Sequence, residues 1–414
     1  MTGMILSKSA ILGSALVVTT ALALGACVSR EPAAAGLTPR EQLGRLLFFD
    51  KGLSANGNQS CATCHEPAVG WTGPFEHINR TGGVYEGSVA GLFSNRKPNS
   101  AAYATQAPIF HLEDAEAGDF VGGNFWDGRA TGERLGNPAA DQALAPFLNP
   151  VEQALPDAKT VVDRVCGGAY AALFKQVWGA AACEDTEKAF GSIGLSIADY
   201  EASAEVNAFS SKYDAFLAGR AELTEQEQRG LRLFEGQGRC ADCHPSRPGP
   251  DGSPPLFTDF TFDNLGLPRN SQNPYYTQPA NPQGTAWVDE GLGGFLAGRV
   301  EFRQYAAGNM GKHRVPTLRN VDLRPSPGFP KCYGHNCYFK DLETFVHFYN
   351  TRLVLPVCAA PEQRPDVDCW PRPEVEANVN TEELGDLGLT EEDEEAIVAF
   401  MATLSDGWAP PDRR

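Results

Sequence analysis

The sequence is poor in positive charge. It has 34 lysine and arginine residues against 52 aspartate and glutamate residues, and its formal net charge is −18 over 414 residues. A surface with this balance repels the phosphates of nucleic acids and the headgroups of anionic lipids, so we expect neither as a partner. An acidic shell suits basic protein partners or small neutral substrates.

The sequence also lacks a hydrophobic run long enough for a membrane span. The apolar stretch AILGSALVVTTALALGAC (10–27) is short and ends in small residues, which is typical of an export signal. Its end, Leu24 to Cys27, resembles a bacterial lipobox, which implies cleavage before Cys27 and a lipid on its sulfur. An ordinary secretory signal that is cut nearby is the alternative. We predict a signal peptide at 1–26, a lipid-anchored tether at 27–37 and a periplasmic protein that touches the membrane through that anchor alone.

The cysteines also favour export. Of the eleven, six belong to no motif and fall into three pairs that are close in sequence. In an oxidising compartment such pairs predict disulfides, here Cys166–Cys183, Cys332–Cys337 and Cys358–Cys369. For one pair a soft metal site is the alternative, with Cys332, His335 and Cys337 as its ligands.

Strand signals are few and short, so the sequence predicts a mainly α fold with long loops. Two stretches repeat each other: TPREQLGRLLFFD (38–50) and TEQEQRGLRLFEG (224–236). Both read as helices that a threonine caps, with a glutamate three residues later as in a capping box. The repeat predicts two similar domains, 38–219 and 220–414.

Each repeated helix precedes a Cys-x-x-Cys-His motif, at 61–65 and at 240–244. This is the attachment signature of c-type haem, in which both thiols add to the vinyl groups and the histidine becomes an axial ligand. A zinc ribbon does not need the fixed histidine, and a thioredoxin-like pair sits in a βα unit that this sequence lacks. We therefore predict two covalent c-type haems, held by Cys61, Cys64 and His65 and by Cys240, Cys243 and His244.

Four further segments carry a family resemblance: FWDGRA (125–130), QALAPFLNPVE (142–152), RVPTLRNV (314–321) and LETFVHFYNTR (342–352). Together with the haem motifs they resemble the bacterial di-haem cytochrome c peroxidases and their relative MauG. The resemblance implies two fused cytochrome c-type domains, with hydrogen peroxide reduced at the N-terminal haem and electrons entering through the C-terminal one. It also implies a small electron-donor protein (a cytochrome c or a cupredoxin) or a protein substrate as partner, and a homodimer.

The resemblance assigns roles to single residues. Glu152 would be the acid–base group beside the first haem, Gln142 and Pro146 would line the same pocket, and Trp126 would carry electrons between the haems. Splitting a peroxide needs a proton moved from one oxygen to the other, which a buried carboxylate with a raised pKa can do. The alternative interpretations are a core tryptophan and a surface carboxylate.

The resemblance places the far-side ligand of the second haem at Tyr349. Leu342, Phe345, Val346 and Tyr349 follow the spacing i, i+3, i+4, i+7 and so share one helical face. Met310 is the alternative ligand. In a further alternative, Tyr349 binds no metal and is an aromatic packing residue. His77 is a candidate resting-state ligand of the first haem.

The choice of ligand bears on function. Tyrosine is a hard anionic ligand, whereas a methionine thioether raises the potential. The leading prediction is a peroxidase; the alternatives are a MauG-like oxidase that modifies Trp or Tyr of a partner protein, and a non-catalytic di-haem electron carrier. The resemblance also implies a calcium ion between the domains, but SNRKPNS (94–100) and Arg324 match its binding segments only in part.

Overall fold

The computed structural model describes residues 36–360 and 362–410. The predicted signal peptide, Cys27 and nearly all of the predicted tether lie outside the described residues. Among the described helices, none is both long and apolar enough to cross a membrane.

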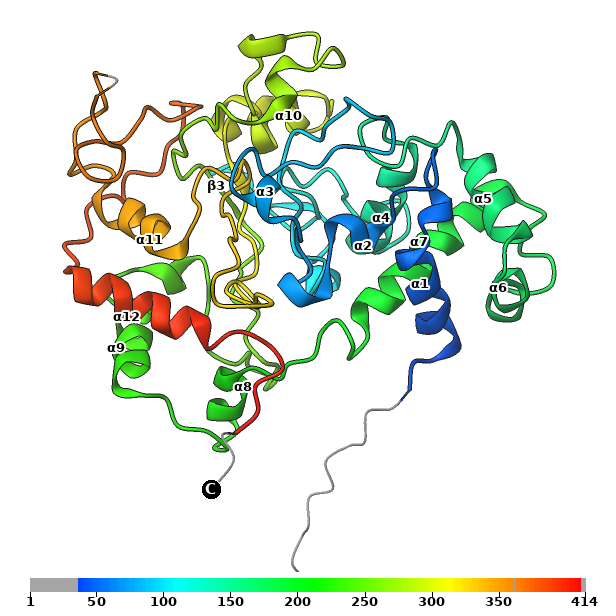
Figure 1. Cartoon of the computed structure of the whole chain (residues 1–414), viewed down its shortest axis with the longest axis horizontal. Coiled ribbons are helices and arrows are strands. Elements are labelled where there is room, and N and C mark those ends of the chain that lie inside the picture. Colours follow the sequence, from blue (N-terminus) through cyan, green and yellow to red (C-terminus); the bar gives the residue numbers. More distant parts are fainter. Residues whose placement is uncertain (1–35, 361, 411–414) are drawn as a thin grey trace, which may run out of the picture. The chain divides into compact units, whose positions relative to one another are not determined.

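Short helices joined by long loops make up the described chain (Figure 1). The prediction of a mainly α protein with few short strands is confirmed. The helices are α1 (Pro39–Phe49), α2 (Cys61–Cys64), α3 (Glu76–Asn79), α4 (Pro138–Leu148), α5 (Ala158–Gly167), α6 (Ala171–Trp178), α7 (Thr186–Ala202), α8 (Lys212–Leu217), α9 (Glu225–Glu235), α10 (Gly291–Ala297), α11 (Leu342–Thr351) and α12 (Glu391–Ala402).

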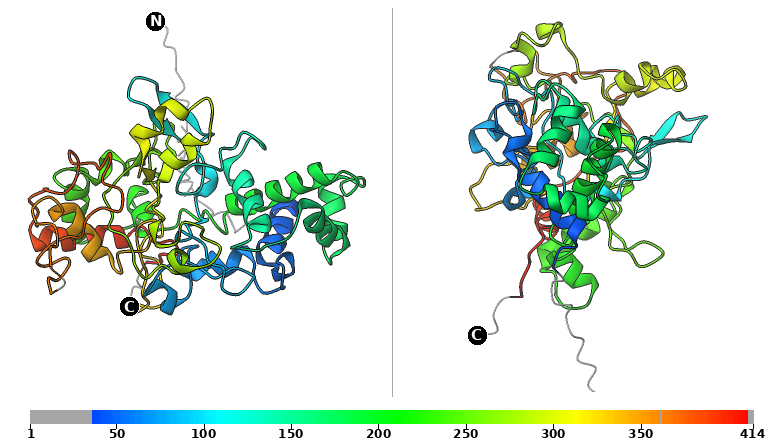
Figure 2. Two further views of the ribbon diagram at one scale, coloured as in Figure 1. Left: turned by 90° about the horizontal axis from the view of Figure 1, so that it is seen from above. Right: turned by 90° about the vertical axis from the view of Figure 1, so that its right-hand side faces the viewer.

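The strands form two small antiparallel pairs. β1 (His111–Asp114) pairs with β2 (Asp119–Val121), and β3 (Phe262–Asp263) pairs with β4 (His313–Arg314). Figure 2 shows the β1–β2 hairpin in cyan beside the yellow-green segment that contains α10. The contact is apolar, because Phe110 and Phe120 pack with Leu292 and Leu296 of α10.

The repeated sequence forms a repeated helix pair: α1 packs on α7, and α9 packs on α12 (Figure 1). Thr38 and Thr224 cap α1 and α9, and each makes the predicted capping box with the glutamate three residues on. A glycine stands at each crossing. A Cβ atom at Gly44 would overlap the carbonyl oxygen of Ser196, and one at Gly230 would overlap that of Ala396. Both crossings are therefore closer than any side chain would permit.

Two separate hydrophobic cores surround these helix pairs. One is built from buried residues between Leu43 and Val206, the other from buried residues between Tyr213 and Leu404. The smaller apolar cluster around Phe110 takes residues from both parts of the chain. The domain boundary near Gly219 stays a prediction, although the two cores fall on either side of it.

The structure pairs the six remaining cysteines of the described chain as their spacing predicts: Cys166 with Cys183, Cys332 with Cys337, and Cys358 with Cys369. Because Cys332 and Cys337 bond to each other, their sulfurs are not available as metal ligands beside His335.

Candidate haem-binding sites

The first anchor is a single helical turn. Helix α2 begins at Cys61 and ends at Cys64, and His65 is its C-cap residue. The Nδ1 atom of His65 lies 3.2 Å from the carbonyl oxygen of Trp71, which fixes the ring and leaves Nε2 free for a metal. Both thiols are free, and burial raises the pKa of Cys61 to about 12, so it stays protonated.

The second anchor repeats this arrangement on a 3₁₀ turn at Cys240–Asp242. The Nδ1 atom of His244 lies 2.8 Å from the carbonyl oxygen of Phe257. Burial lowers the pKa of His244 to about 4, which keeps the imidazole neutral, the form that binds a metal. Both histidines are thus oriented by a backbone carbonyl, as axial ligands usually are.

A cavity opens beside the first anchor. Its wall includes Cys61, Cys64 and His65. Gln142, Pro146, Glu152 and Trp126 line the same cavity. The structure therefore brings all four residues that the resemblance assigns to the first haem around one space, while their roles stay predictions.

Helix α4 and the turn after it position the acid. Gln142 and Pro146 belong to α4, and the chain then folds back so that Gln153 donates a backbone hydrogen bond to the carbonyl oxygen of Pro146 (3.0 Å). This turn carries Glu152 into the cavity wall. Burial raises the pKa of Glu152, and the opposing charge of Arg129 is the largest influence that lowers it.

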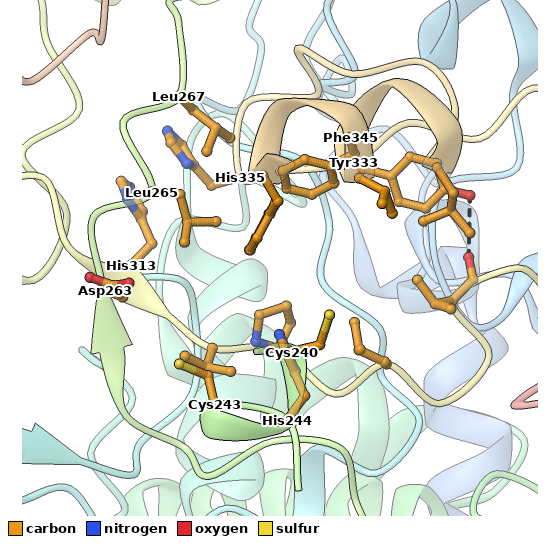
Figure 3. A pocket seen from close by; sticks show the side chains of 18 of the residues that line it. Cys240, Cys243, His244, Asp263, Leu265, Leu267, His313, Tyr333, His335 and Phe345 are labelled. Carbon is orange, nitrogen blue, oxygen red and sulfur yellow. Dashed lines mark hydrogen bonds between the residues drawn. The ribbon is translucent and has the colours of Figure 1, made fainter. Parts of the chain in front are cut away.

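The second cavity is larger and more apolar than the first. Cys240, Cys243 and His244 lie along one side of it (Figure 3). The predicted face of α11 forms another part of its wall, because Leu342, Phe345, Val346 and Tyr349 all line it.

Tyr349 reaches the second cavity in a protonated state. Burial, followed by the nearby Cys243 and Asp263, raises its pKa well above the ordinary value. A metal ion would be needed to draw the proton from this phenol.

The alternative ligands lie elsewhere. Met310 is not among the described residues that line the second cavity, whereas Met401 of α12 is, as part of the hydrophobic core. His77 is exposed on α3 and is not among the described residues of the first cavity wall. Its ring packs 6.1 Å from that of Phe75.

Trp126 is the residue predicted to carry electrons between the two haems. It lines both cavities and is 9% exposed. Its indole Nε1–H donates to the carbonyl oxygen of Lys97 at 2.8 Å, which fixes the ring plane. An indole held in this way can exchange electrons with both sites.

Sequence reasoning missed a buried polar network next to Trp126. Arg96 joins Asp127 and Asp289 at 2.6 Å each, and the ring of His335 lies 6.3 Å from that of Trp126. His335 stacks on His313 with ring centroids 3.6 Å apart. Segments far apart in the sequence supply these residues, so no local sequence pattern predicts the network.

Within this network Asp289, His313 and His335 form the one group of described side chains close enough to hold a metal ion. The two imidazole rings are stacked with an angle of 7°, so their in-plane lone pairs run parallel and do not converge on one ion. The set also differs from the oxygen cage that calcium prefers. The calcium ion stays a prediction.

Glu201 is a second missed residue. It lines the first cavity from α7, is 8% exposed, and burial raises its pKa to about 8. It follows Tyr200 in α7, where no motif marks it in the sequence.

Both cavities fit a covalent haem. Each combines a cysteine pair with a histidine whose Nδ1 atom lies against a backbone carbonyl oxygen. The four motif cysteines are the free cysteines among the described residues.

Comparison with known proteins agrees with these sites. A family model described as di-haem cytochrome c peroxidase matches residues 38–222. The chain is 36% identical over 374 residues to the methylamine utilization protein MauG of Paracoccus denitrificans (strain Pd 1222), covering 88% of each chain. It is 27% identical over 376 residues to the cytochrome-c peroxidase IdrP1 of Denitromonas iodatirespirans, covering 88% of this chain and 80% of that protein.

Among solved structures, the fold is similar to that of the diheme peroxidase BthA from Burkholderia thailandensis E264. The TM-score is 0.73 at 30% sequence identity, and the match covers 91% of this chain and 88% of the other.

Proposed function

Because the chain belongs to the di-haem cytochrome c peroxidase and MauG family of oxidoreductases, we propose that it reduces hydrogen peroxide in the first cavity with electrons relayed from the second. One peroxide takes up two electrons and two protons and leaves as two water molecules. The family implies two c-type haems, and the two cysteine–histidine anchors are their attachment points.

One observation carries this proposal: the wall of each cavity contains Trp126, while the acid Glu152 lines only the first and the phenol Tyr349 only the second among the described residues. A pure electron carrier needs no buried acid beside a haem. Asp263, Asp289, Glu374 and Glu383 line the second cavity, so a buried acid alone does not distinguish the two. The combination of Glu152 with Gln142 and Pro146 beside the first anchor supports proton-coupled chemistry there, with the other site as the source of electrons.

In the first cavity the chain's own residues handle the protons. The bound haem supplies a coordination position for peroxide and the redox equivalents. The carboxylate of Glu152, whose pKa burial raises, takes a proton from one peroxide oxygen and then, as the carboxylic acid, gives it to the oxygen that leaves. Pro146 has no N–H to offer, so its ring contributes shape and limits the water next to the acid.

A second candidate function differs only in the source of the electrons. Tyr349 lines the second cavity and Met310 is not among its described wall residues, and an anionic phenolate ligand favours oxidised iron. This supports oxidation of a Trp or Tyr side chain on a partner protein, in the manner that similarity to MauG suggests.

A single variant tests the proposed route. We expect Trp126→Phe to keep two covalent haems and to bind peroxide, but to lose most of the oxidation of the second haem that follows peroxide addition. Stopped-flow absorbance at wavelengths that separate the two haems measures this. Trp287→Phe is the matched control, because Trp287 packs between Tyr275 and Tyr276 and is not among the described wall residues of either cavity. Equal rates in both variants and wild type would remove Trp126 from the route.

The same assay separates the two electron sources. A reduced small cytochrome c or cupredoxin that is consumed two equivalents per peroxide supports the peroxidase. A partner protein that gains a modified Trp or Tyr, seen as a mass change, supports the MauG-like oxidase.

We also propose that the protein is exported and held by a lipid on Cys27. The lipobox-like end of the apolar stretch and the three disulfide pairs support this. Labelling of cells with a radioactive fatty acid should mark the wild-type protein and not Cys27→Ser; a labelled variant would refute the anchor.

A further inference from the structure

Two cationic side chains face the haem cavities without an anion to pair with. Lys97 lines both cavities, and Arg314 of β4 lines the second. Among the described residues neither forms an ion pair with a carboxylate. The side chain of Lys97 makes a single described hydrogen bond, at 3.3 Å to the carbonyl oxygen of Pro98. The Nε atom of Arg314 is buried and has no hydrogen-bond partner.

The chain satisfies its other buried cations in this region. Arg96 pairs with Asp127 and Asp289, and Arg319 pairs with Asp214. Lys331 donates to three carbonyl oxygens, those of Val69, Asn320 and Leu323. Against this background the two unpaired cations stand out, because an uncompensated buried charge costs several kcal/mol.

Burial lowers the pKa of both groups. It lowers the pKa of Lys97 to about 8 and that of Arg314 to about 10. Both groups stay mainly protonated at neutral pH, and an anion beside either one would raise its pKa again. The walls of both cavities therefore present positive charge that no anion balances, and Lys97 is the cation that the two walls share.

The haem itself carries that charge. Its vinyl groups are held by the motif cysteines, and the opposite edge of the macrocycle carries two propionate carboxylates, so two haems bring four carboxylates. We propose that Lys97 binds propionates of both haems and that Arg314 binds a propionate of the second haem. This inference rests on the two-haem loading in the proposed function and adds the residues that hold the far edge of each haem.

Lys97 then acts at two points of the electron route. Its carbonyl oxygen accepts the indole hydrogen of Trp126 at 2.8 Å, and its ammonium holds the edges of the two haems on either side. One residue thereby sets the position of the relay relative to both redox centres. Its positive charge also favours the reduced form of each haem and raises both midpoint potentials.

The test uses the purified two-haem protein and reads the haems directly. In Lys97→Met we expect the propionate bending bands of both haems to move in resonance Raman spectra, and both midpoint potentials to shift downward in spectroelectrochemical titration. In Arg314→Met we expect the same changes for the second haem alone. Lys97→Arg keeps the cation and should restore both sets of bands toward those of wild type.

Lys331→Met is the matched control. Lys331 is buried in the wall of the second cavity, but carbonyl oxygens already accept hydrogen bonds from its three N–H groups, so we expect the propionate bands of Lys331→Met to match those of wild type. Unchanged bands and potentials in Lys97→Met would overturn the inference, and changes confined to one haem would overturn the shared contact. Failure of wild type to carry two haems would instead refute the proposed function, and the haem count in the first preparation separates the two cases.

Discussion

The two haem cavities share one anchor design and differ in almost everything that faces the anchor. In both, a cysteine pair spans one turn and a histidine donates its Nδ1 hydrogen to a backbone carbonyl. Across the first cavity stand polar groups, with Glu152 and Gln142 among them; across the second stands the largely apolar face of α11 with Tyr349. The repeat holds the cofactor, and the unrepeated segments decide what the cofactor does.

The two halves of the chain are alike in their helix pairs and differ in the segments that face the cavities. The helix pairs α1–α7 and α9–α12 repeat down to the glycine at each crossing. The turn after α4 and the helix α11 lie outside the repeated sequence segments, and each supplies residues that face one cavity alone. A scaffold that is duplicated in this way leaves its loops free to diverge, because loops tolerate change that a packed helix crossing does not.

The largest effect is expected when the acid of the first cavity is removed, because the two cavities differ most in this group. In Glu152→Gln the side chain keeps its size and loses the group that accepts a proton, so we expect the reaction with peroxide to slow by about 10²–10⁴-fold. The spectrum of the second haem should not change. Stopped-flow measurement over a range of peroxide concentrations gives the rate constant.

Glu86→Gln is the control for this prediction, because Glu86 is an exposed carboxylate at the edge of the same cavity. It should react at close to the wild-type rate. If Glu152→Gln reacted as fast as Glu86→Gln, the first cavity would not owe its chemistry to this acid.

The second cavity is tested by Tyr349→Phe. If the phenolate binds the iron, its loss removes an anionic ligand, and the midpoint potential of the second haem should rise by something on the order of 0.1 V. Phe348→Leu offers a control on the same helix, since Phe348 packs into the core and is not among the described wall residues. A potential and a spectrum that survive Tyr349→Phe unchanged would leave Tyr349 as a packing residue.

The repeated crossings can be compared by adding one methyl group to each. Gly44→Ala and Gly230→Ala each force a Cβ atom into a carbonyl oxygen of the facing helix, so we expect each to lower the free energy of unfolding by about 1–3 kcal/mol. Chemical denaturation measures the loss. Gly167→Ala at the end of α5 meets nothing within 4 Å and should be neutral or slightly stabilising. Loss at one crossing alone would mean that the two pairs are not equivalent.

The sequence predicts the parts of these sites that depend on local spacing. The cysteine–histidine motifs, the capping boxes of α1 and α9, and the cavity face of α11 are all set by residues within a few turns of one another. The family resemblance adds Gln142 and Glu152, which the turn after α4 places in the same wall.

What the sequence does not reveal is the region between the cavities. Three loops and the strand β4 supply Lys97, Asp289, His335 and His313 without periodic spacing, and only the folded chain brings them to Trp126 and to one another. For the same reason Lys97 reads as an ordinary surface lysine until both cavity walls are known.

The smallest expected effect refines the electrostatics of the first cavity. Arg129 lowers the pKa of Glu152, which burial raises, so Arg129→Gln should let that pKa rise further. Glu152 accepts a proton only when it is ionised; the acid limb of the pH–rate profile should therefore move to higher pH, while the rate at alkaline pH stays the same. We expect a shift below about one pH unit, or roughly 1.4 kcal/mol, because Arg129 is partly exposed and pairs with Asp127. Arg134→Gln, which loses an exposed pair with Glu187, should leave the profile in place. A limb that moved to lower pH would show that Arg129 does not lower this pKa, and a rate that fell at alkaline instead of acid pH would show that the protonated form of Glu152 is the one that reacts.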